Sequence, residues 1–302
     1  MRIQAVINKK AGGALSGSAE KLAREAEAVF KAGGHETEVY IVEPRDIKAA
    51  FNKALAAAPD ILVVGGGDGT IKSAATRLIG TSAALGILPL GTVNRLARDL
   101  NIPIEPGAAL RALANGSFRH IDAADVNGHI FLCNSMLGLP TEISLRRRHL
   151  RGRPFWARTT GYFKLLRSIL ASRRHMELVI DGDEQMSRRV RVLSLAISNN
   201  VYKHEPSLTF AREALDHGKL GVYIPKPHSG LGLLWVLVRA ALGFWSGDGR
   251  LDCLSASRLV IKTRRKRLRL CNDGEVQTLK APLRYQIHPK ALKVFVPAPQ
   301  SR

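Results

Sequence analysis

The chain has 302 residues, enough for two packed domains and more than one small module needs. Its hydrophobic content of 45% is ordinary for a globular protein, so a proper core is expected and a disordered chain is excluded. Lys and Arg number 46 against 25 Asp and Glu, which gives a formal net charge of +21 at pH 7. This excess predicts an anionic partner, and by itself does not choose among nucleic acid, an acidic membrane surface and phosphorylated ligands.

The cysteines and the apolar runs exclude further classes. Cys133, Cys253 and Cys271 are scattered and odd in number, which indicates reduced thiols in a cytosolic protein rather than disulfides or a zinc site. The apolar start at 1–7 is too short for the core of a signal peptide. The longest apolar run, 231–245, spans about 15 residues, short of the roughly 20 that cross a bilayer. We therefore expect a cytoplasmic protein, soluble or peripheral to the membrane.

Short apolar runs alternate with amphipathic helical patterns over about the first 120 residues. Strand patterns fall at 2–7, 39–42, 61–64 and 85–88, and helical patterns at 22–30, 47–55 and 71–78. Alternation at this spacing implies right-handed crossovers and a parallel sheet covered on both faces. The pattern predicts an α/β, Rossmann-like domain at the N-terminus.

Beyond this point the pattern becomes that of an antiparallel β domain. Asn127-Gly128 and Asp181-Gly182 are hairpin turn signals between strand-like runs. Further strands are expected at 189–198, 220–224, 258–263, 267–270, 283–287 and 292–296, and helices at 161–172 and 231–244. The second part is therefore predicted to be an antiparallel β-sandwich.

A buried strand at 61–64 runs into a loop of four glycines, one Asp and one Thr at 65–70, followed by a helix. Glycines let the backbone approach a ligand, and the N–H groups at a helix N-terminus attract phosphates. The loop fits neither Gly-x-Gly-x-x-Gly nor the Gly-Lys-Ser/Thr ending of a P-loop. Asp68 would repel phosphate unless a cation or a reacting hydroxyl lies beside it, so it is a candidate Mg²⁺ ligand or base. The alternative is a tight turn with Asp68 as a helix cap.

Four short segments together resemble the diacylglycerol kinase catalytic-domain family, which includes bacterial lipid kinases and sphingosine and ceramide kinases. The family's Gly-Gly-Asp-Gly-Thr stands at 66–70, its Pro-x-Gly-Thr-x-Asn at 89–94, its opening Asn-Pro-x-x-Gly at 8–12 with Lys9 replacing Pro, and its Asp-Gly-Glu at 273–275. Their order and spacing cover nearly the whole chain, whereas Gly-Gly-Asp-Gly alone is shared with NAD kinases and phosphofructokinases. The resemblance implies a nucleotide-binding domain of that type at 1–122 and a β-rich lipid-kinase domain at 123–302.

The resemblance also implies roles for individual residues. ATP would bind at Asn8, Gly66, Gly67, Asp68, Gly69, Thr70, Thr92 and Asn94. Asp68 and Glu275 would be the catalytic carboxylates that place Mg²⁺ and activate the lipid hydroxyl, with Asp122 as a further acidic residue. Read without the resemblance, Asp273-Gly274 is a hairpin turn, Asp122 a strand-end residue, and Asn94 with Thr92 a cap of the next helix.

Three departures from the family pattern bear on these roles. Arg95 stands where the family usually has Asp, which adds positive charge near the nucleotide. A structural Mg²⁺ site of bacterial members uses an Asp directly before Gly, and here His217 precedes Gly218, which argues against that metal. The family's glycine pair after residue 200 is replaced by 201–205, which alters the lipid site that Asn134–Gly138 would line.

The segment 146–158 is densely basic and carries Phe155 and Trp156, ahead of a helical pattern at 162–169. Basic residues interleaved with interfacial aromatics suit docking on anionic headgroups. The alternative is a solvated loop followed by a core-packed helix. The run 231–245 is a second membrane candidate, or equally a buried helix. We expect peripheral association with the inner face of the membrane, and the sequence leaves a homodimer open.

The main hypothesis is an ATP-dependent lipid kinase of phospholipid metabolism, with an alcohol group as acceptor. Diacylglycerol, phosphatidylglycerol, ceramide and sphingoid bases all present such a hydroxyl. One alternative is a soluble-substrate kinase such as an NAD kinase. The other is a non-catalytic protein on the same fold that binds nucleic acid or membrane; under the main hypothesis no nucleic-acid partner is expected.

Overall fold

The computed structural model describes residues 1–11, 18–150, 167, 175–183, 187–202, 212, 214–226, 231–232, 235 and 251–298. The chain divides into two compact units, one formed by Met1–Ile121 with the chain from Pro289 onward, the other by Asp122–His288. The domain boundary predicted from the sequence lies after residue 122, with all later residues assigned to the second domain. In the structure, the chain from Pro289 onward belongs to the first unit. Several predicted segments lie wholly or partly outside the described residues: 151–158 of the basic run at 146–158, the expected helix at 161–172 apart from residue 167, the segment 203–205, and most of 231–245.

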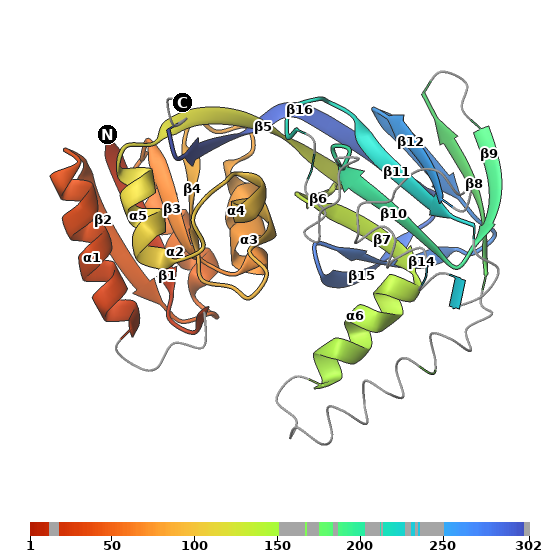
Figure 1. Cartoon of the computed structure of the whole chain (residues 1–302), viewed down its shortest axis with the longest axis horizontal. Helices are drawn as coiled ribbons and strands as arrows, with labels where there is room; N and C mark the ends of the chain where they lie inside the picture. Colours follow the sequence, from red (N-terminus) through yellow and green to blue (C-terminus); the bar gives the residue numbers. More distant parts are fainter. Residues whose placement is uncertain are drawn as a thin grey trace. The chain divides into compact units, whose positions relative to one another are not determined.

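The first unit is built on a parallel sheet (Figure 1). Its strands run in the order β2-β1-β3-β4, and β3 and β4 are buried along their whole length because their apolar residues are covered on both faces. Next to β4, the end of β16 pairs in parallel through Val294 and Phe295. The bounds are β1 Arg2–Asn8, β2 Glu36–Val42, β3 Ile61–Gly66, β4 Ala84–Pro89 and β16 Leu283–Val296.

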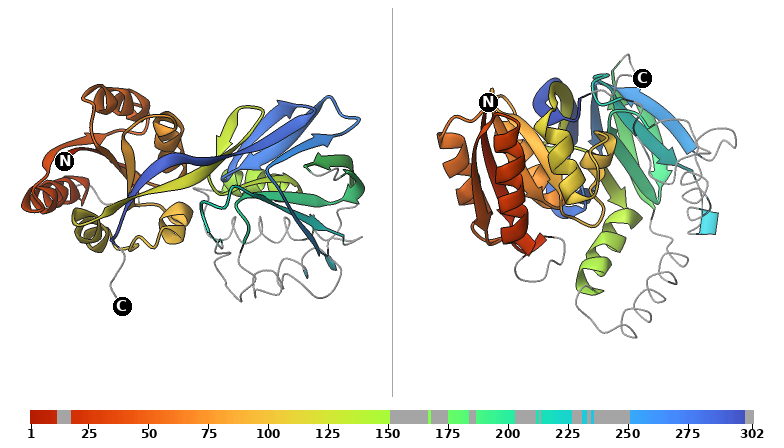
Figure 2. Two further views of the ribbon diagram at one scale, coloured as in Figure 1. Left: turned by 90° about the horizontal axis from the view of Figure 1, so that it is seen from above. Right: turned by 60° about the vertical axis from the view of Figure 1, so that its left-hand side comes forward.

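Helices cover both faces of this sheet, as the left view in Figure 2 shows from above. Helices α1 and α5 contact each other on one face, and α2 and α3 contact each other on the opposite face. The apolar spacing in α2 buries Ile47, Phe51 and Ala54 against the strands, as an amphipathic helix requires. The helices are α1 Ser18–Ala32, α2 Ile47–Ala56, α3 Asp68–Leu78, α4 Arg95–Asp99 and α5 Pro106–Ala114. The Rossmann-like prediction is confirmed.

The second unit is a β-sandwich. One layer is the antiparallel sheet β12-β11-β10-β7-β14-β15, and the other contains β9, β8, β13, the beginning of β16, the end of β5, and β6. Side chains from both layers, among them Leu137, Leu195, Leu259 and Leu283, form one buried core. The bounds are β5 Ser117–Val126, β6 His129–Phe131, β7 Asn134–Gly138, α6 Leu139–Leu150, β8 Met176–Gly182, β9 Ser187–Val192, β10 Ser194–Asn199, β11 Leu220–Pro225, β12 Leu251–Ala256, β13 Arg258–Lys262, β14 Arg267–Asn272 and β15 Glu275–Lys280.

Two strand predictions were wrong in their extent. The run 189–198 is not one strand, because it divides at Leu193 into β9 and β10, which belong to different layers. The Leu193 carbonyl accepts the N–H of Leu139 instead of continuing a ladder. Conversely, 283–287 and 292–296 form the single strand β16, which pairs first with β13 and then with β4. Partner strands far away in the sequence decided both cases.

Two glycines with nearly the same φ provide a test of packing in this unit. Gly128, in the β5–β6 turn, has φ +80 and open space where a Cβ would stand. Gly138, at the end of β7, has φ +81, but a Cβ there would collide with the Leu193 carbonyl oxygen at the β9–β10 crossing.

We expect Gly128→Ala to lower the free energy of unfolding by about 1 kcal/mol, the cost of a left-handed Ala. Gly138→Ala should cost about 3 kcal/mol, because overpacking adds to the same strain. Urea unfolding of both variants measures the difference. Equal losses of unfolding free energy in the two variants would show that the backbone at Leu193 moves aside without cost.

Candidate functional site

The glycine loop connects β3 to α3. Gly67 is extended, with φ −88 and ψ 178, and precedes the first turn of α3. The Thr70 N–H donates to the Gly67 carbonyl at 2.9 Å, so the loop turns tightly into the helix. A Cβ on Gly66 would lie 2.6 Å from the Thr70 side chain, so only glycine fits there. The loop therefore presents the N-terminus of an 11-residue helix, which attracts anions.

A second turn, after β4, packs against the first. The Leu90 N–H donates to the Gly66 carbonyl at 3.0 Å, and a Cβ on Gly91 would lie 2.6 Å from the Gly67 Cα. Asn94 is buried at φ +51, and its amide both accepts from the Gly91 N–H and donates to the Gly91 carbonyl, each at 2.8 Å. Its side chain thus closes the turn, and Thr92 is left exposed at the surface. The two loops meet backbone to backbone.

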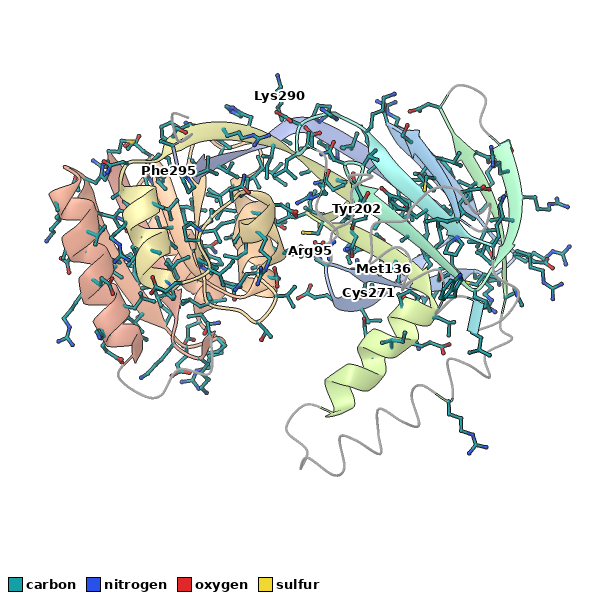
Figure 3. The ribbon with its side chains drawn as sticks, viewed as in Figure 1. Arg95, Met136, Tyr202, Cys271, Lys290 and Phe295 are labelled. Carbon is teal, nitrogen blue, oxygen red and sulfur yellow. The ribbon has the colours of Figure 1, made fainter. Side chains whose placement is uncertain are left out.

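Asp68 ties these two loops together. Its Oδ1 accepts the N–H of Arg95 at 2.7 Å and its Oδ2 accepts the N–H of Asn94 at 3.1 Å. Both donors lie where α4 begins; Figure 3 labels Arg95 there. Asp68 therefore caps the following helix, α4, across the turn. This explains how a carboxylate is accommodated inside an anion-attracting loop, because backbone donors already stabilise its charge.

Asn8 brings a third strand end to the same place. It is the last residue of β1, and its Nδ2 lies 3.5 Å from the Thr70 Oγ1, while its Oδ1 accepts the Lys10 N–H at 3.1 Å. Strands β1, β3 and β4 are neighbours, so the motifs at 8, 66–70 and 89–94 gather at the carboxyl ends of adjacent parallel strands. Ligands of open α/β sheets bind at such an edge. The predicted nucleotide-binding residues are thus together in the first unit.

A cavity of about 420 Å³ adjoins this edge. Its lining includes Asn8, Gly91 and Asn94, and also residues that sequence reasoning missed: Lys21, Leu22 and Glu25 on α1, and Ile104 and Glu105 before α5. Glu105 caps α5, and the N–H groups of Gly107 and Ala108 hold the pKa of its carboxyl below the ordinary value. The Glu105-Pro106 pair, a cap followed by Pro at the first helical position, is the signal that marks this helix start.

In the second unit, Asp273-Gly274 forms the turn between β14 and β15. Their φ values, +51 and +85, are those of a two-residue hairpin turn of type I′, so the turn interpretation holds. The Asp273 carboxylate accepts the N–H groups of Leu132, Cys133 and Asn134 at 2.8, 2.9 and 3.0 Å. It anchors the hairpin to the β6–β7 connection. Glu275 follows as the exposed first residue of β15.

Polar side chains collect at the same edge of this sheet. Asn134 on β7 lies opposite Ser198 on β10, and Asn272 on β14 lies opposite Ser135. Figure 3 labels Tyr202, whose hydroxyl accepts from the Asn134 amide at 3.3 Å, together with Met136 and its cross-strand neighbour Cys271. Below the edge, the Ser135 and Tyr285 hydroxyls are 3.0 Å apart, and burial raises the pKa of Tyr285.

Asp122 is completely buried. Its N–H donates to the Leu215 carbonyl and its Oδ2 accepts the Gly218 N–H, both at 2.7 Å, while its carbonyl accepts the Asn199 amide at 2.9 Å. These bonds hold the loop at 215–218 in place. The arrangement supports a positioning role for Asp122, and its catalytic role stays a prediction.

The loop at 215–218 does not fit the structural Mg²⁺ site of the resembled family. His217 is exposed at the expected ligand position, its N–H donates to the Asn200 Oδ1 at 3.2 Å, and the Asp122 carboxylate already holds the next N–H. Among the described residues, no three His, Cys, Asp or Glu side chains gather as a metal site. Asp68 is a better candidate metal ligand than His217, because each of its carboxylate oxygens accepts one N–H and keeps a free lone pair. That suits a single carboxylate ligand to Mg²⁺, which takes most of its other ligands from phosphates and water.

The first unit thus gathers two glycine loops at the carboxyl edge of a parallel sheet, and the second unit carries its own hairpin anchored by Asp273. Residues 2–126 match the family model described as the diacylglycerol kinase catalytic domain. A probable lipid kinase YegS-like of Pseudomonas aeruginosa is 30% identical over 91% of this chain and 89% of its own length, and one of Pseudomonas syringae pv. syringae is 30% identical over 91% and 88%. The chain belongs to the diacylglycerol kinase catalytic-domain family of lipid kinases.

Solved structures support the fold. A diacylglycerol kinase from Bacillus anthracis covers 99% of this chain with 97% of its own, at a TM-score of 0.72 and 17% identity. A putative diacylglycerol kinase from the same organism gives a TM-score of 0.74 at 18% identity, with the same coverage. At these identities the likeness establishes the architecture alone. In the described part of the chain, no helix has the length and apolar character needed to cross a membrane.

The three bonds to Asp273 give a stability prediction. Asp273→Gly keeps the positive φ free of strain and removes only the acceptor, leaving three part-buried N–H groups without it. We expect a loss of about 3 kcal/mol in the free energy of unfolding, measured with urea. Asp273→Asn, which tolerates the same φ and keeps one oxygen, should lose distinctly less. If both variants unfold like the parent protein, the hairpin does not depend on this anchor.

Proposed function

We propose that this protein transfers the γ-phosphate of ATP to the hydroxyl of a membrane lipid. The observation that carries the proposal is the pairing of two glycine turns by Asp68 at the carboxyl ends of β1, β3 and β4. Such an edge binds nucleotide phosphates through backbone donors, and the chain belongs to a lipid kinase family.

Nucleotide binding is assigned to Asn8, Gly66, Gly67, Asp68, Gly69, Thr70, Thr92 and Asn94. Gly67 lets the phosphates approach the backbone, and the first turn of α3 supplies N–H donors. Asp68 would hold Mg²⁺, which supplies charge neutralisation on the phosphates when bound. The cavity beside Asn8 and Gly91 offers room for the remainder of the nucleotide.

In the proposed transfer, the lipid hydroxyl oxygen bonds to the γ-phosphorus and the bond to the leaving ADP oxygen breaks. The hydroxyl proton passes to a carboxylate. Asp68 and Glu275 divide the tasks of holding the metal and taking this proton. Asp68 suits a task that demands fixed geometry, because two backbone donors hold it in place, whereas Glu275 is exposed at the start of β15.

Membrane contact is the second part of the proposal. Leu231 and Trp235 are large apolar side chains that stand exposed, at 65% and 51%. Exposed Leu and Trp side chains suit the bilayer interface on the cytoplasmic side. The basic run at 146–158 remains a sequence-based prediction of the same contact.

Substitutions at two glycines separate nucleotide contact from folding. A Cβ on Gly67 meets nothing closer than 3.4 Å, so Gly67→Ala should keep the stability of the parent protein. If phosphates approach this backbone, the methyl group should weaken ATP binding at least roughly tenfold. Gly91→Ala should lower stability as well, because its Cβ would press on Gly67 and Asn94. Binding of a fluorescent ATP analogue and thermal unfolding, measured together, check both outcomes. Unchanged nucleotide affinity in Gly67→Ala would contradict the assignment.

The carboxylates give a prediction for activity. With γ-labelled ATP, Mg²⁺ and lipids in mixed micelles, Asp68→Asn and Glu275→Gln should each lower transfer at least roughly a thousandfold. Asp46→Ala, which removes an exposed acid without a capping bond, is the control and should not change the rate.

A panel of diacylglycerol, phosphatidylglycerol, ceramide and a sphingoid base, resolved by chromatography, identifies the acceptor. Labelled NAD instead of lipid would favour a soluble-substrate kinase. No labelled product with any acceptor would overturn the proposal.

A further inference from the structure

The second unit carries a hollow lined by arginines that none of the assigned roles uses. Its volume is about 570 Å³, and its walls include Arg265, Arg267, Arg269, Thr141 and Thr278. Leu139, Met176 and Leu268 add apolar side chains, Glu142 adds one acid, and Gly138, the last residue of β7, completes the lining. A neighbouring hollow of about 350 Å³ shares Met176, Arg265 and Leu268, and adds Arg191, Arg264, His175 and Glu177.

The β14 strand explains why the arginines gather. Its burial alternates, so that Arg267 and Arg269 point outward while Leu268 enters the core. Residues two apart on one strand face are about 7 Å from each other, close enough for both guanidinium groups to reach one phosphate group. Across the ladder, Thr278 lies opposite Arg269 and Lys280 lies opposite Arg267. Arg264, Arg265 and Lys266 extend the cations into the exposed β13–β14 turn.

Within the part of the chain that the structure describes, these cations differ from their neighbours in lacking acidic partners. Lys262 pairs with Asp181 at 2.9 Å, Arg188 pairs with Asp252 at 3.3 Å, and Lys226 pairs with Asp252 at 2.7 Å. Over the described part of the chain, Arg264, Arg265, Lys266, Arg267 and Arg269 form no such pair. Arg267 and Lys280 even stand directly opposite each other, and like charges in that position destabilise a strand pair. An anion bound between them would remove this cost.

The geometry points to a docking surface for anionic phospholipid headgroups, formed by Arg264, Arg265, Lys266, Arg267, Arg269 and Lys280. The headgroup phosphate enters the larger hollow, where guanidinium forks and the Thr278 hydroxyl are its donors. The choice of a bilayer over a soluble anion rests on the proposed function, because a kinase whose acceptor is a membrane lipid works at such a surface. Two neighbouring hollows, of about 570 and 350 Å³ and both lined by Arg265, also suit several headgroups better than one small ion.

Vesicle sedimentation without nucleotide tests the surface. The parent protein should bind vesicles of phosphatidylcholine with phosphatidylglycerol, bind pure phosphatidylcholine far less, and lose binding as salt rises. Replacing Arg265, Arg267 and Arg269 together by Gln should lower partitioning onto the anionic vesicles roughly a hundredfold. The matched control removes three exposed cations elsewhere, Arg24→Gln, Lys48→Gln and Arg284→Gln, and should bind within a few-fold of the parent. The triple Arg→Lys variant, which keeps the charge, should retain most binding and shows that changes at these positions permit folding.

Equal losses in the Gln variant and the control would overturn the proposal, since net charge alone would then explain binding. Unchanged vesicle binding together with lost DNA binding in the Gln variant would also overturn it, in favour of a nucleic-acid surface. Transfer to lipid in mixed micelles, measured on the same variants, separates the two claims. Normal transfer with unchanged vesicle binding refutes the docking surface alone, and absent transfer in the parent protein refutes the kinase alone.

Discussion

The hydrogen bonds from Asn94 and Arg95 to the Asp68 carboxylate are the contact on which the candidate nucleotide site depends. They hold the turn after β4 against the loop after β3, at a separation that only glycine backbones permit. A carboxylate in an anion-attracting loop is unfavourable unless donors surround it, and the start of α4 provides them. The glycines, the buried amide of Asn94 and the short helix α4 are all consequences of this one arrangement.

In the second unit, too, backbone N–H groups stabilise the carboxylate of an acidic residue in a turn. Asp273 stands in a left-handed turn conformation and accepts three N–H groups from the β6–β7 connection, which fixes the hairpin that presents Glu275. The buried Asp122 carboxylate likewise accepts a hydrogen bond from a backbone N–H, that of Gly218. An acidic residue in a family motif can therefore have a structural role. Its hydrogen bonds to backbone N–H groups distinguish that role from a catalytic one. Asp68 combines a scaffold task with an assigned chemical one, whereas the Glu275 side chain stands exposed.

The distribution of charge gives the net value of +21 a physical meaning. Around β9, β12 and β13, cations stand beside carboxylates and add little to the external field. On β14 and the turn before it, the arginines have no such partners among the described residues, and they line a hollow. Positive potential is strongest where charges of one sign line a concave surface, so an anionic partner should be recognised there. The net charge indicated an anionic partner, and the distribution of ion pairs indicates where that partner would bind.

The sequence by itself determined the fold class, the family, and β1 to β4 with α1 to α3 of the first unit, because apolar periodicity and glycine motifs are local properties of the chain. It did not predict α4 or α5. The structure then brought the motifs at 8, 66–70 and 89–94 together, since β1, β3 and β4 are neighbouring parallel strands. Only the tertiary structure decided that Asp68 caps α4, that 189–198 divides between two layers, and that β16 joins two runs. The arginine hollow was also invisible in the sequence. Each of these depends on a partner distant along the chain, and no local pattern records which partner a backbone group or a guanidinium will meet.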